Sequence, residues 1–317
     1  MRVGIDLGGT KMQAIVVEGE QTVKGQARLP TPTSGGPDAV IASLADSVRG
    51  ACEDAGASVG SIEGIGLGSP GSIVDGTVAN AMNLPQWPEQ PVPVARELAK
   101  ALGVKVPVEI GNDVDVATNA EFTLGAAAEY DSLLGVFWGT GVGGGVILDG
   151  KQWNGRGGAG EIGHMVVVRG GRRCPCGREG CMEAYAGRAA MEARARKLHD
   201  EKGRKTKLFH IMKERGRDRL TSGIWARAVE QDDELALELL EEAVAAIATA
   251  AASAVNLLDP EAVVIGGGLG VRFGEPWVEK IRAAMQPHLF RDEDPPAIML
   301  AGLGDLGGAL GAALLVR

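Results

Sequence analysis

Two segments of the chain share one layout, and this repetition constrains the fold more than any other feature of the sequence. Residues 2–7 and 12–18 read as two strands joined by the glycine turn DLGGTK, and residues 132–138 and 145–148 read as two strands joined by GTGVGGG. Glycine at such turns allows positive φ and lets backbone N–H groups approach phosphate oxygens without a Cβ in the way. A layout that occurs twice indicates an internal duplication at the scale of a domain.

The rest of the chain alternates between helix and strand patterns, as is typical of an α/β protein. Further strands are predicted at 62–68, 106–110, 262–265 and 297–301. Helices are predicted at 37–56, 93–102, 113–128, 187–201, 221–258, 275–287 and 305–316. Because 317 residues exceed the usual size of one domain, we expect two lobes that meet at a cleft. These are residues 1–113 and 114–304, with the terminal segment 305–317 crossing back to the first lobe.

A third glycine turn, GGGLG at 266–270, follows a predicted strand, but the glycine segments do not fit the common nucleotide fingerprints. GLGSPG at 66–71 matches G-x-G-x-x-G, yet the following SIVDGT signals a hairpin rather than the helix that a dinucleotide site requires. GTGVGG fails in the same way, because VILDG continues as a strand, and GGTK lacks the G-K-[ST] ending of a Walker A motif. Neither common nucleotide fold is predicted.

Composition narrows the classes of function. A net charge of −9 argues against a general nucleic-acid binder, because affinity for the phosphate backbone rests on clustered Lys and Arg. The basic stretch 194–219 reads as a solvated helix face rather than an anion-binding patch. The opening MRVGIDLGGT has no signal-peptide pattern, and the longest uncharged run, 243–258, is too short and alanine-rich to span a bilayer. We therefore expect a cytoplasmic protein without nucleic-acid or membrane partners.

Three of the four cysteines fall within the stretch CPCGREGCME at 174–183, which is compatible with a redox centre, a disulfide or a metal site. The C-x-C spacing differs from the thioredoxin-type C-x-x-C, and structural disulfides are uncommon in the cytosol. With His164, the residues Cys174, Cys176 and Cys181 supply three thiolates and one imidazole, a closed set suited to structural zinc. Cys52 lies on a predicted helix and is expected to be a small core or surface residue.

Taken together and in chain order, DLGGTK, GND (111–113), GTGVGGG, EIGH (161–164) and CPCGREGCME resemble the motifs of the ROK family of bacterial sugar kinases. This family is part of the sugar kinase, actin and Hsp70 superfamily, and the resemblance extends over essentially the whole chain. It implies an α/β fold of two duplicated actin-like (ribonuclease H-like) lobes with a cleft between them. It also implies a small zinc-binding insertion at 161–183.

The resemblance assigns roles to particular residues. Asp113 becomes the general base, although its place at a predicted helix start fits an N-cap equally well. Sugar contacts are implied for Asn83, Asn112, Asp113, Glu161, His164 and Glu183. Nucleotide contacts are implied for Asp6, Gly8, Gly9, Thr10, Lys11, Gly139, Thr140, Gly141, Gly266, Gly267 and Gly268, with Asp6 holding Mg²⁺ through water. The implied zinc ligands are His164, Cys174, Cys176 and Cys181.

The function that follows is ATP-dependent phosphorylation of a hexose, with ATP, Mg²⁺ and structural Zn²⁺ as cofactors. We expect glucose as the acceptor and glucose 6-phosphate as the product; fructose, mannose, allose and N-acetylmannosamine are alternatives, as is polyphosphate as the donor. The sugar-sensing repressors of the family carry a helix-turn-helix ahead of the first phosphate loop, which starts here at Asp6. A regulator without catalysis is therefore not expected. The resemblance also suggests a homodimer or homotetramer.

Overall fold

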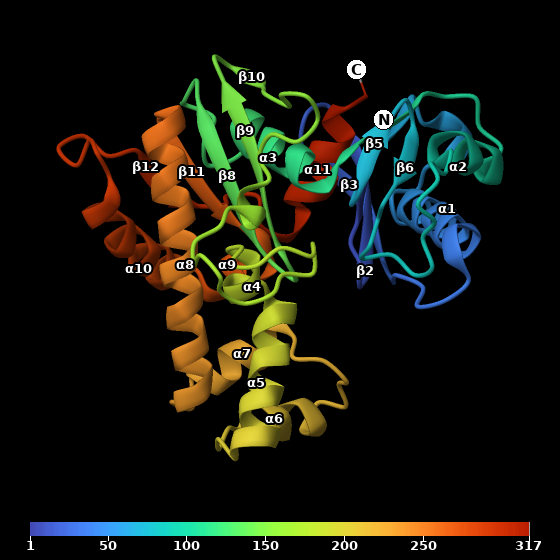
Figure 1. Cartoon of the computed structure of the whole chain (residues 1–317). Coiled ribbons are helices and arrows are strands. Elements are labelled where there is room, and N and C mark those ends of the chain that lie inside the picture. The colour runs from blue at the N-terminus through green and yellow to red at the C-terminus, as the bar shows by residue number, and fades with distance from the viewer. Residues whose placement is uncertain (317) are drawn as a thin grey trace. The chain divides into compact units, whose positions relative to one another are not determined.

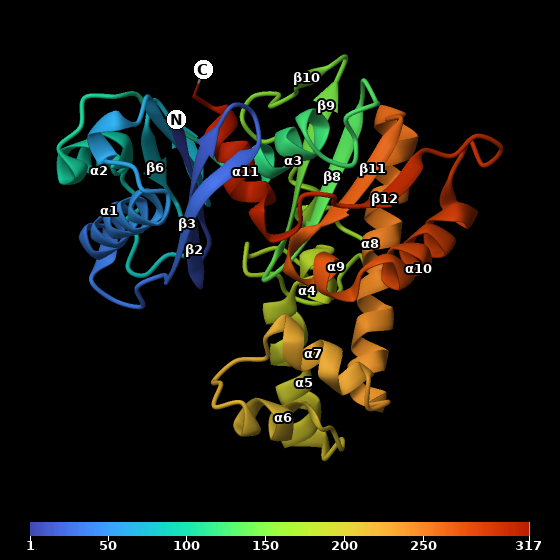
Figure 2. The same ribbon diagram turned by 180° about the vertical axis from the view of Figure 1, so that it is seen from behind.

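The computed structural model describes residues 1–316; Arg317, which the predicted crossing segment includes, lies outside the described residues. The chain forms two compact units (Figures 1 and 2). The first comprises Met1–Ala128 and the C-terminal segment from Asp305, and the second comprises Glu129–Gly304. The first unit extends beyond residue 113 because the helix that begins there packs against the C-terminal helix.

The first unit is built on a five-stranded sheet in the order β3-β2-β1-β4-β7. Its strands are β1 (Arg2–Leu7), β2 (Lys11–Glu18), β3 (Thr22–Pro30), β4 (Gly64–Ser69) and β7 (Val108–Asn112). β1, β4 and β7 run parallel, whereas β2 is antiparallel to both β1 and β3. The predicted SIVDGT hairpin is confirmed as β5 (Ser72–Val74) and β6 (Thr77–Ala79).

Helices cover both faces of this sheet. α1 (Gly36–Asp54) and α2 (Val94–Leu102) lie on one side, and α3 (Asp113–Thr123) and α11 (Gly307–Leu314) lie on the other (Figure 1). Two glycines let α11 rest directly on the strands: a Cβ at Gly66 would lie 1.7 Å from the Ala312 carbonyl oxygen, and one at Gly4 would lie 1.9 Å from that of Ala309. No side chain larger than hydrogen fits at either strand position.

The second unit repeats the topology of the first. Its sheet has the order β10-β9-β8-β11-β12, with the first three strands antiparallel and β8, β11 and β12 parallel. The strands are β8 (Leu133–Trp138), β9 (Val142–Leu148), β10 (Lys151–Gln152), β11 (Ala262–Gly266) and β12 (Ala297–Leu300). The predicted α/β fold with an internal duplication is confirmed.

The helices of the second unit form its core against the sheet and a separate extension. They are α4 (Glu183–Ala186), α5 (Arg188–Lys202), α6 (Leu208–Glu214), α7 (Ser222–Val229), α8 (Glu234–Leu258), α9 (Gly267–Phe273) and α10 (Glu275–Met285). α5, α6, α7 and the first turns of α8 extend away from the sheet (Figures 1 and 2). Short 3-10 turns occupy Val59–Ser61, Ile162–His164, Gln286–His288 and Gly304–Leu306. Among residues 1–316, no helix is both long and apolar enough to cross a membrane.

The prediction of one continuous helix over 221–258 is wrong. α7 ends at Val229 and α8 begins at Glu234, because Asp232 adopts a left-handed φ of 54° and Asp233 caps the new helix. The Asp233 carboxylate accepts a hydrogen bond from the Ala236 N–H at 2.8 Å. A short polar side chain that competes with the helix for backbone donors is the usual reason for such a break.

β3, α6 and α9 are among the elements that were not predicted. β3 is an edge strand with exposed, charged and glycine-containing sequence, TVKGQARLP, so it lacks a clear apolar alternation. α6 and α9 are only one to two turns long, and α9 starts inside the third glycine segment. Helices this short depend on packing rather than on propensity.

Candidate active site

Two hydrogen bonds at Gly8 stabilise the first glycine turn. Gly8 donates its N–H to the Lys11 carbonyl at 3.0 Å, and the Thr31 hydroxyl donates to the Gly8 carbonyl at 2.6 Å. A Cβ at Gly9 would lie 2.7 Å from the Asn83 carbonyl oxygen. The structure therefore brings Asn83 next to the first turn, and Gly9 leaves space for it.

Asn112 and Asp113 lie where β7 ends and α3 begins. Asn112 is the N-cap, because its Oδ1 accepts from the N–H groups of Val114 and Asp115 at 3.0 and 3.2 Å. The reading of Asp113 as the N-cap is therefore wrong, although its Oδ1 also accepts from Val114 at 3.0 Å. A sugar contact made by Asn112 would come from its Nδ2 group, since its Oδ1 is engaged.

Asp6 and Asp113 stand at the carboxyl ends of parallel strands. Asp6 pairs with Gly68 of β4, and a Cβ at Gly68 would lie 3.5 Å from the Cα of Asp113. Burial, reinforced by the negative charge of Asp6, raises the pKa of Asp113 to about 7. A carboxyl group with a pKa near neutrality can accept and release a proton under physiological conditions.

A small charged cluster surrounds Asp6. Burial raises the pKa of Asp6, while the nearby cations Lys11 and Arg28 oppose that increase and Asp305 adds to it. Asp305 lies 3.8 Å from the Lys11 Nζ and 3.2 Å from an Arg28 Nη. Arg28 and Asp305 were not identified from the sequence, because they come from an unpredicted strand and from a segment nearly 300 residues away from Lys11.

In the second unit, hydrogen bonds stabilise the loop between β8 and β9 at both of its ends. Gly139 donates to the Gly141 carbonyl at 2.9 Å, and the Arg188 guanidinium donates to the Thr140 hydroxyl at 2.8 Å. Glu183 accepts the Val142 N–H through Oε2 at 2.9 Å, and a Cβ at Gly141 would lie 2.2 Å from the same oxygen. Glu183 thus holds this loop, a contact that its predicted role as a sugar ligand did not include.

The third glycine segment lies beside this loop. Gly266 ends β11, and Gly267 starts α9 with a φ of 79°; a Cβ there would lie 2.6 Å from the Trp138 carbonyl oxygen. The nearest approach between the two segments is at Gly139, where a Cβ would lie 3.9 Å from the Gly268 nitrogen. The residues predicted as nucleotide contacts in the second unit are therefore brought together.

The four predicted zinc ligands also converge. Their ligand atoms all lie within 4.8 Å of one another, with 3.7 Å between Cys174 Sγ and His164 Nδ1 and 3.7 Å between Cys176 Sγ and Cys181 Sγ. A tetrahedral ion with metal–sulfur bonds of ~2.3 Å requires sulfur–sulfur separations of ~3.8 Å. Both the donor set and the spacing fit Zn²⁺.

Two carboxylates lie beside this cluster. The Nε2 of His164 lies 3.8 Å from Glu161 Oε2, and the Cys174 thiol lies 3.9 Å from Glu183 Oε1. The Glu161 side chain is 65% exposed. Both predicted sugar carboxylates thus lie beside the cluster, Glu161 near its imidazole and Glu183 near one of its thiols.

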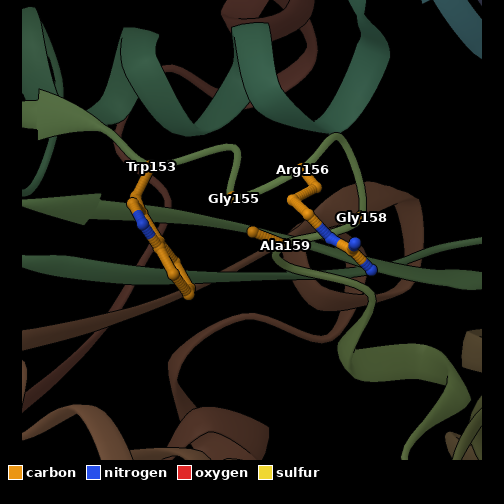
Figure 3. Close-up of a pocket in the computed structure, with 5 residues that line it drawn as sticks. All are labelled: Trp153, Gly155, Arg156, Gly158 and Ala159. Carbon is orange, nitrogen blue, oxygen red and sulfur yellow. The ribbon is translucent and has the colours of Figure 1, made fainter.

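A hollow of about 480 Å³ opens beside the loop that leads from β10 to Glu161. Trp153 and Arg156 flank it with Ala159 between them, and Gly155 and Gly158 complete the lining (Figure 3). Its lining contains neither a carboxylate nor a nucleophile, and it includes none of the predicted site residues.

Comparison with known proteins agrees with this geometry. The profile of the ROK family matches residues 2–317. The chain is 32% identical to a glucokinase of Thermotoga maritima, covering 99% of this chain and 96% of that protein. It is also 32% identical to an N-acetylgalactosamine kinase of Shewanella sp., again covering 99% of this chain and 96% of that protein.

Solved structures match over the same length. A ROK family glucokinase from Streptomyces griseus, determined in complex with glucose and AMPPNP, is 29% identical and superposes with a TM-score of 0.85. That match covers 100% of this chain and 99% of the other. The order of the motifs, the duplicated sheets and the whole-length match together show that this chain is a member of the ROK family.

Proposed function

We propose that the protein transfers the γ-phosphoryl group of ATP to a hydroxyl group of a hexose, with glucose as the favoured acceptor. The observation that carries this proposal is Asp113, a half-buried carboxyl group with a pKa of about 7 at the carboxyl end of β7. Family membership and the glucose and AMPPNP bound to the Streptomyces griseus relative support the choice of substrates.

In the proposed reaction, the ionised Asp113 accepts the proton of the attacking sugar hydroxyl. The sugar oxygen forms a bond to the γ-phosphorus while the bond from that phosphorus to the bridging oxygen breaks and ADP leaves. In each unit, the glycine loop (8–11 or 139–141) would offer backbone N–H groups to a phosphate. Such donors stabilise the charge that develops during transfer.

Mg²⁺ would neutralise the phosphates, and Asp6 is the residue suited to hold it. Asp6 is a half-buried carboxylate whose pKa stays raised in spite of the nearby cations Lys11 and Arg28, so a further cation would stabilise its charge. Hard cations such as Mg²⁺ prefer carboxylate and water oxygens.

Zn²⁺ fits the Cys and His cluster as a structural ion. Four protein ligands leave no open coordination position, so the ion supplies rigidity rather than chemistry. By fixing His164 and the neighbouring carboxylates of Glu161 and Glu183, the cluster would pre-order the groups that hydrogen-bond the sugar.

A panel assay tests the proposal. The purified protein is incubated with Mg²⁺ and glucose, fructose, mannose, allose, N-acetylmannosamine or N-acetylgalactosamine, with ATP or polyphosphate as the donor, and sugar phosphate is quantified directly. We expect the highest kcat/KM for glucose with ATP. Asp113→Asn should lower kcat at least about 100-fold, the lower end for loss of a general base. A folded Asp113→Asn protein with near-normal turnover would exclude Asp113 as the base, and no turnover of any sugar would exclude the kinase function.

A further inference from the structure

We propose that Arg188 is a phosphate-binding residue of the donor site. Its guanidinium group would donate hydrogen bonds to the phosphates of the nucleotide that are not transferred. This inference rests on the proposed kinase function and adds a residue that none of the sequence motifs contains. Arg188 is the first residue of α5, and only Gly187 separates it from the end of α4.

The guanidinium group is fixed beside the second glycine loop. One Nη donates to the Thr140 hydroxyl at 2.8 Å and the other donates to the Leu220 carbonyl at 2.8 Å. The backbone adds two contacts to the same loop, from the Arg188 N–H to the Gly139 carbonyl at 3.1 Å and from the Ala189 N–H to the Thr140 carbonyl at 3.0 Å. Arg188 is therefore pre-positioned at the loop before any ligand arrives.

Its hydrogen-bonding capacity is only partly used. A guanidinium group has five N–H donors, and two of them are engaged in these contacts. Phosphate oxygens are the acceptors that match several parallel N–H groups of arginine. The remaining donors are thus suited to a second acceptor at the loop.

Arg188 also has no carboxylate in direct contact, although the charge of Glu192 acts on it from one turn away. Among the carboxylates of residues 1–316, none lies within 4.0 Å of its guanidinium nitrogens. Glu192, one turn along α5, is engaged elsewhere, because it accepts hydrogen bonds from Arg196 and from the Leu220 N–H. Burial lowers the pKa of Arg188, Glu192 opposes this, and the positive charge of Arg219 lowers it further.

Two other arginines of the second unit, in contrast, contact carboxylates directly. Arg172 pairs with Glu242 at 2.6 Å, and Arg204 pairs with Glu238 at 2.7 Å. A partly buried cation without a carboxylate is costly, whereas a bound anion would remove that cost. The position beside a glycine loop, where the guanidinium group already contacts the exposed Thr140, indicates which anion: a phosphate of the donor.

Calorimetric titration of the full-length, zinc-loaded protein with ADP and with adenosine tests the inference. Arg188→Met retains most of the methylene stem and removes the charge and both hydrogen bonds. We expect its Kd for ADP to rise about 10- to 100-fold, which is the usual loss for hydrogen bonds to charged groups, with its Kd for adenosine unchanged. Arg188→Lys, which keeps the charge without the planar fork, should be intermediate.

Arg227→Met is the matched control, because Arg227 is an exposed arginine of the same unit that pairs with Glu230 at 2.9 Å; it should bind ADP like the wild type. Equal ADP affinity in Arg188→Met and the wild type, equal losses for ADP and adenosine, or no ADP binding by the wild type would each overturn the inference. If Arg188→Met selectively loses ADP but the wild type phosphorylates no sugar, the kinase proposal fails and the phosphate-binding role of Arg188 stands.

Discussion

At the scale of the residue, the protonation of Asp113 should govern how the reaction rate depends on pH. Burial and the charge of Asp6 raise the pKa of Asp113 to about 7. A general base works only in its ionised form, so kcat/KM should rise about tenfold per pH unit below about pH 7 and reach a plateau above it. Direct measurement of sugar phosphate formation between about pH 5.5 and about pH 9 tests this. A flat profile across that range would exclude Asp113 as a base with the raised pKa.

The same raised pKa means that the ionised form of Asp113 destabilises the folded protein. Because the folded pKa lies above the ordinary value, the native protein binds the proton more tightly, and stability is lost as pH rises toward 7. Asp113→Asn removes the charge and keeps an Oδ1 that can accept the Val114 N–H. We expect this variant to be more stable than the wild type by on the order of 2 kcal/mol at pH 8, with a smaller difference at pH 5.

Calorimetric Tm values of both proteins at the two pH values measure this effect. A variant that is less stable than the wild type at pH 8, or a gap that widens toward pH 5, would contradict the assignment of a half-buried, proton-binding Asp113.

At the scale of the element, the cluster of His164, Cys174, Cys176 and Cys181 connects the insertion to the loop between β8 and β9. Glu183 makes this connection, because its two carboxylate oxygens lie near the Cys174 thiol and the Val142 N–H. Structural zinc contributes about 10–16 kcal/mol to the folding of small peptides. Its loss should therefore disorder the insertion and the orientation of Glu183.

Cys176→Ala should bind less than one equivalent of zinc and lose hexose affinity at least about tenfold, because the sugar-binding groups are no longer pre-ordered. Zinc content by elemental analysis and sugar binding by calorimetry are the measurements. Cys52→Ala is the control, since Cys52 is buried in α1 of the other unit and should leave zinc and sugar binding unchanged. A metal-free variant with normal sugar affinity would contradict the positional role of the cluster.

Asp233 determines where α8 begins and also anchors the start of α6. Its side chain is almost fully buried and accepts hydrogen bonds from the backbone N–H groups of Ala236 and Lys207, at 2.8 and 2.5 Å, and from the Thr206 hydroxyl. Asp233→Ala removes a helix cap and leaves buried donors unpaired. We expect a loss of about 2–4 kcal/mol in the free energy of unfolding.

Denaturant unfolding of the full-length protein measures this loss. Asp232→Gly is the neighbouring control: Asp232 has a left-handed φ of 54°, which glycine adopts without strain, so its effect should be within about 0.5 kcal/mol. Equal stability of Asp233→Ala and the wild type would show that the segment around 206 does not depend on Asp233.

At the scale of the whole molecule, the first unit includes the C-terminal helix α11, which packs on its sheet. α11 contacts β1 and β4 at Gly4 and Gly66, so the unit is complete only when the C-terminal segment has been made. A methyl group at Gly66 would meet the Ala312 carbonyl of α11 at 1.7 Å, and a helix backbone cannot move aside without losing its packing.

Gly66→Ala should therefore destabilise the protein by about 3 kcal/mol or more, beyond the usual cost of overpacking. The thermal unfolding midpoint measures this effect. Gly60→Ala is the matched control, because a Cβ there would meet nothing within 4 Å and its φ is not positive. For a chain of this size, a shift of about 2 °C in the midpoint corresponds to a loss of less than ~1 kcal/mol in the free energy of unfolding. A shift no larger than this in Gly66→Ala would show that α11 is not tightly packed at this point.

The sequence by itself determined the class of fold and the three glycine segments, and it singled out Asp113 and the four Cys and His residues that the structure brings together. These depend on short spacings and on a repeated pattern, which remain visible without long-range contacts. The tertiary structure decided which residue caps α3, where the helix predicted over 221–258 breaks, and what Glu183 and Arg188 contact. Glu183 lies 41 residues from Val142, and Arg188 lies 48 residues from Thr140. Contacts at such separations depend on how sheets and helices pack, and no local periodicity records them.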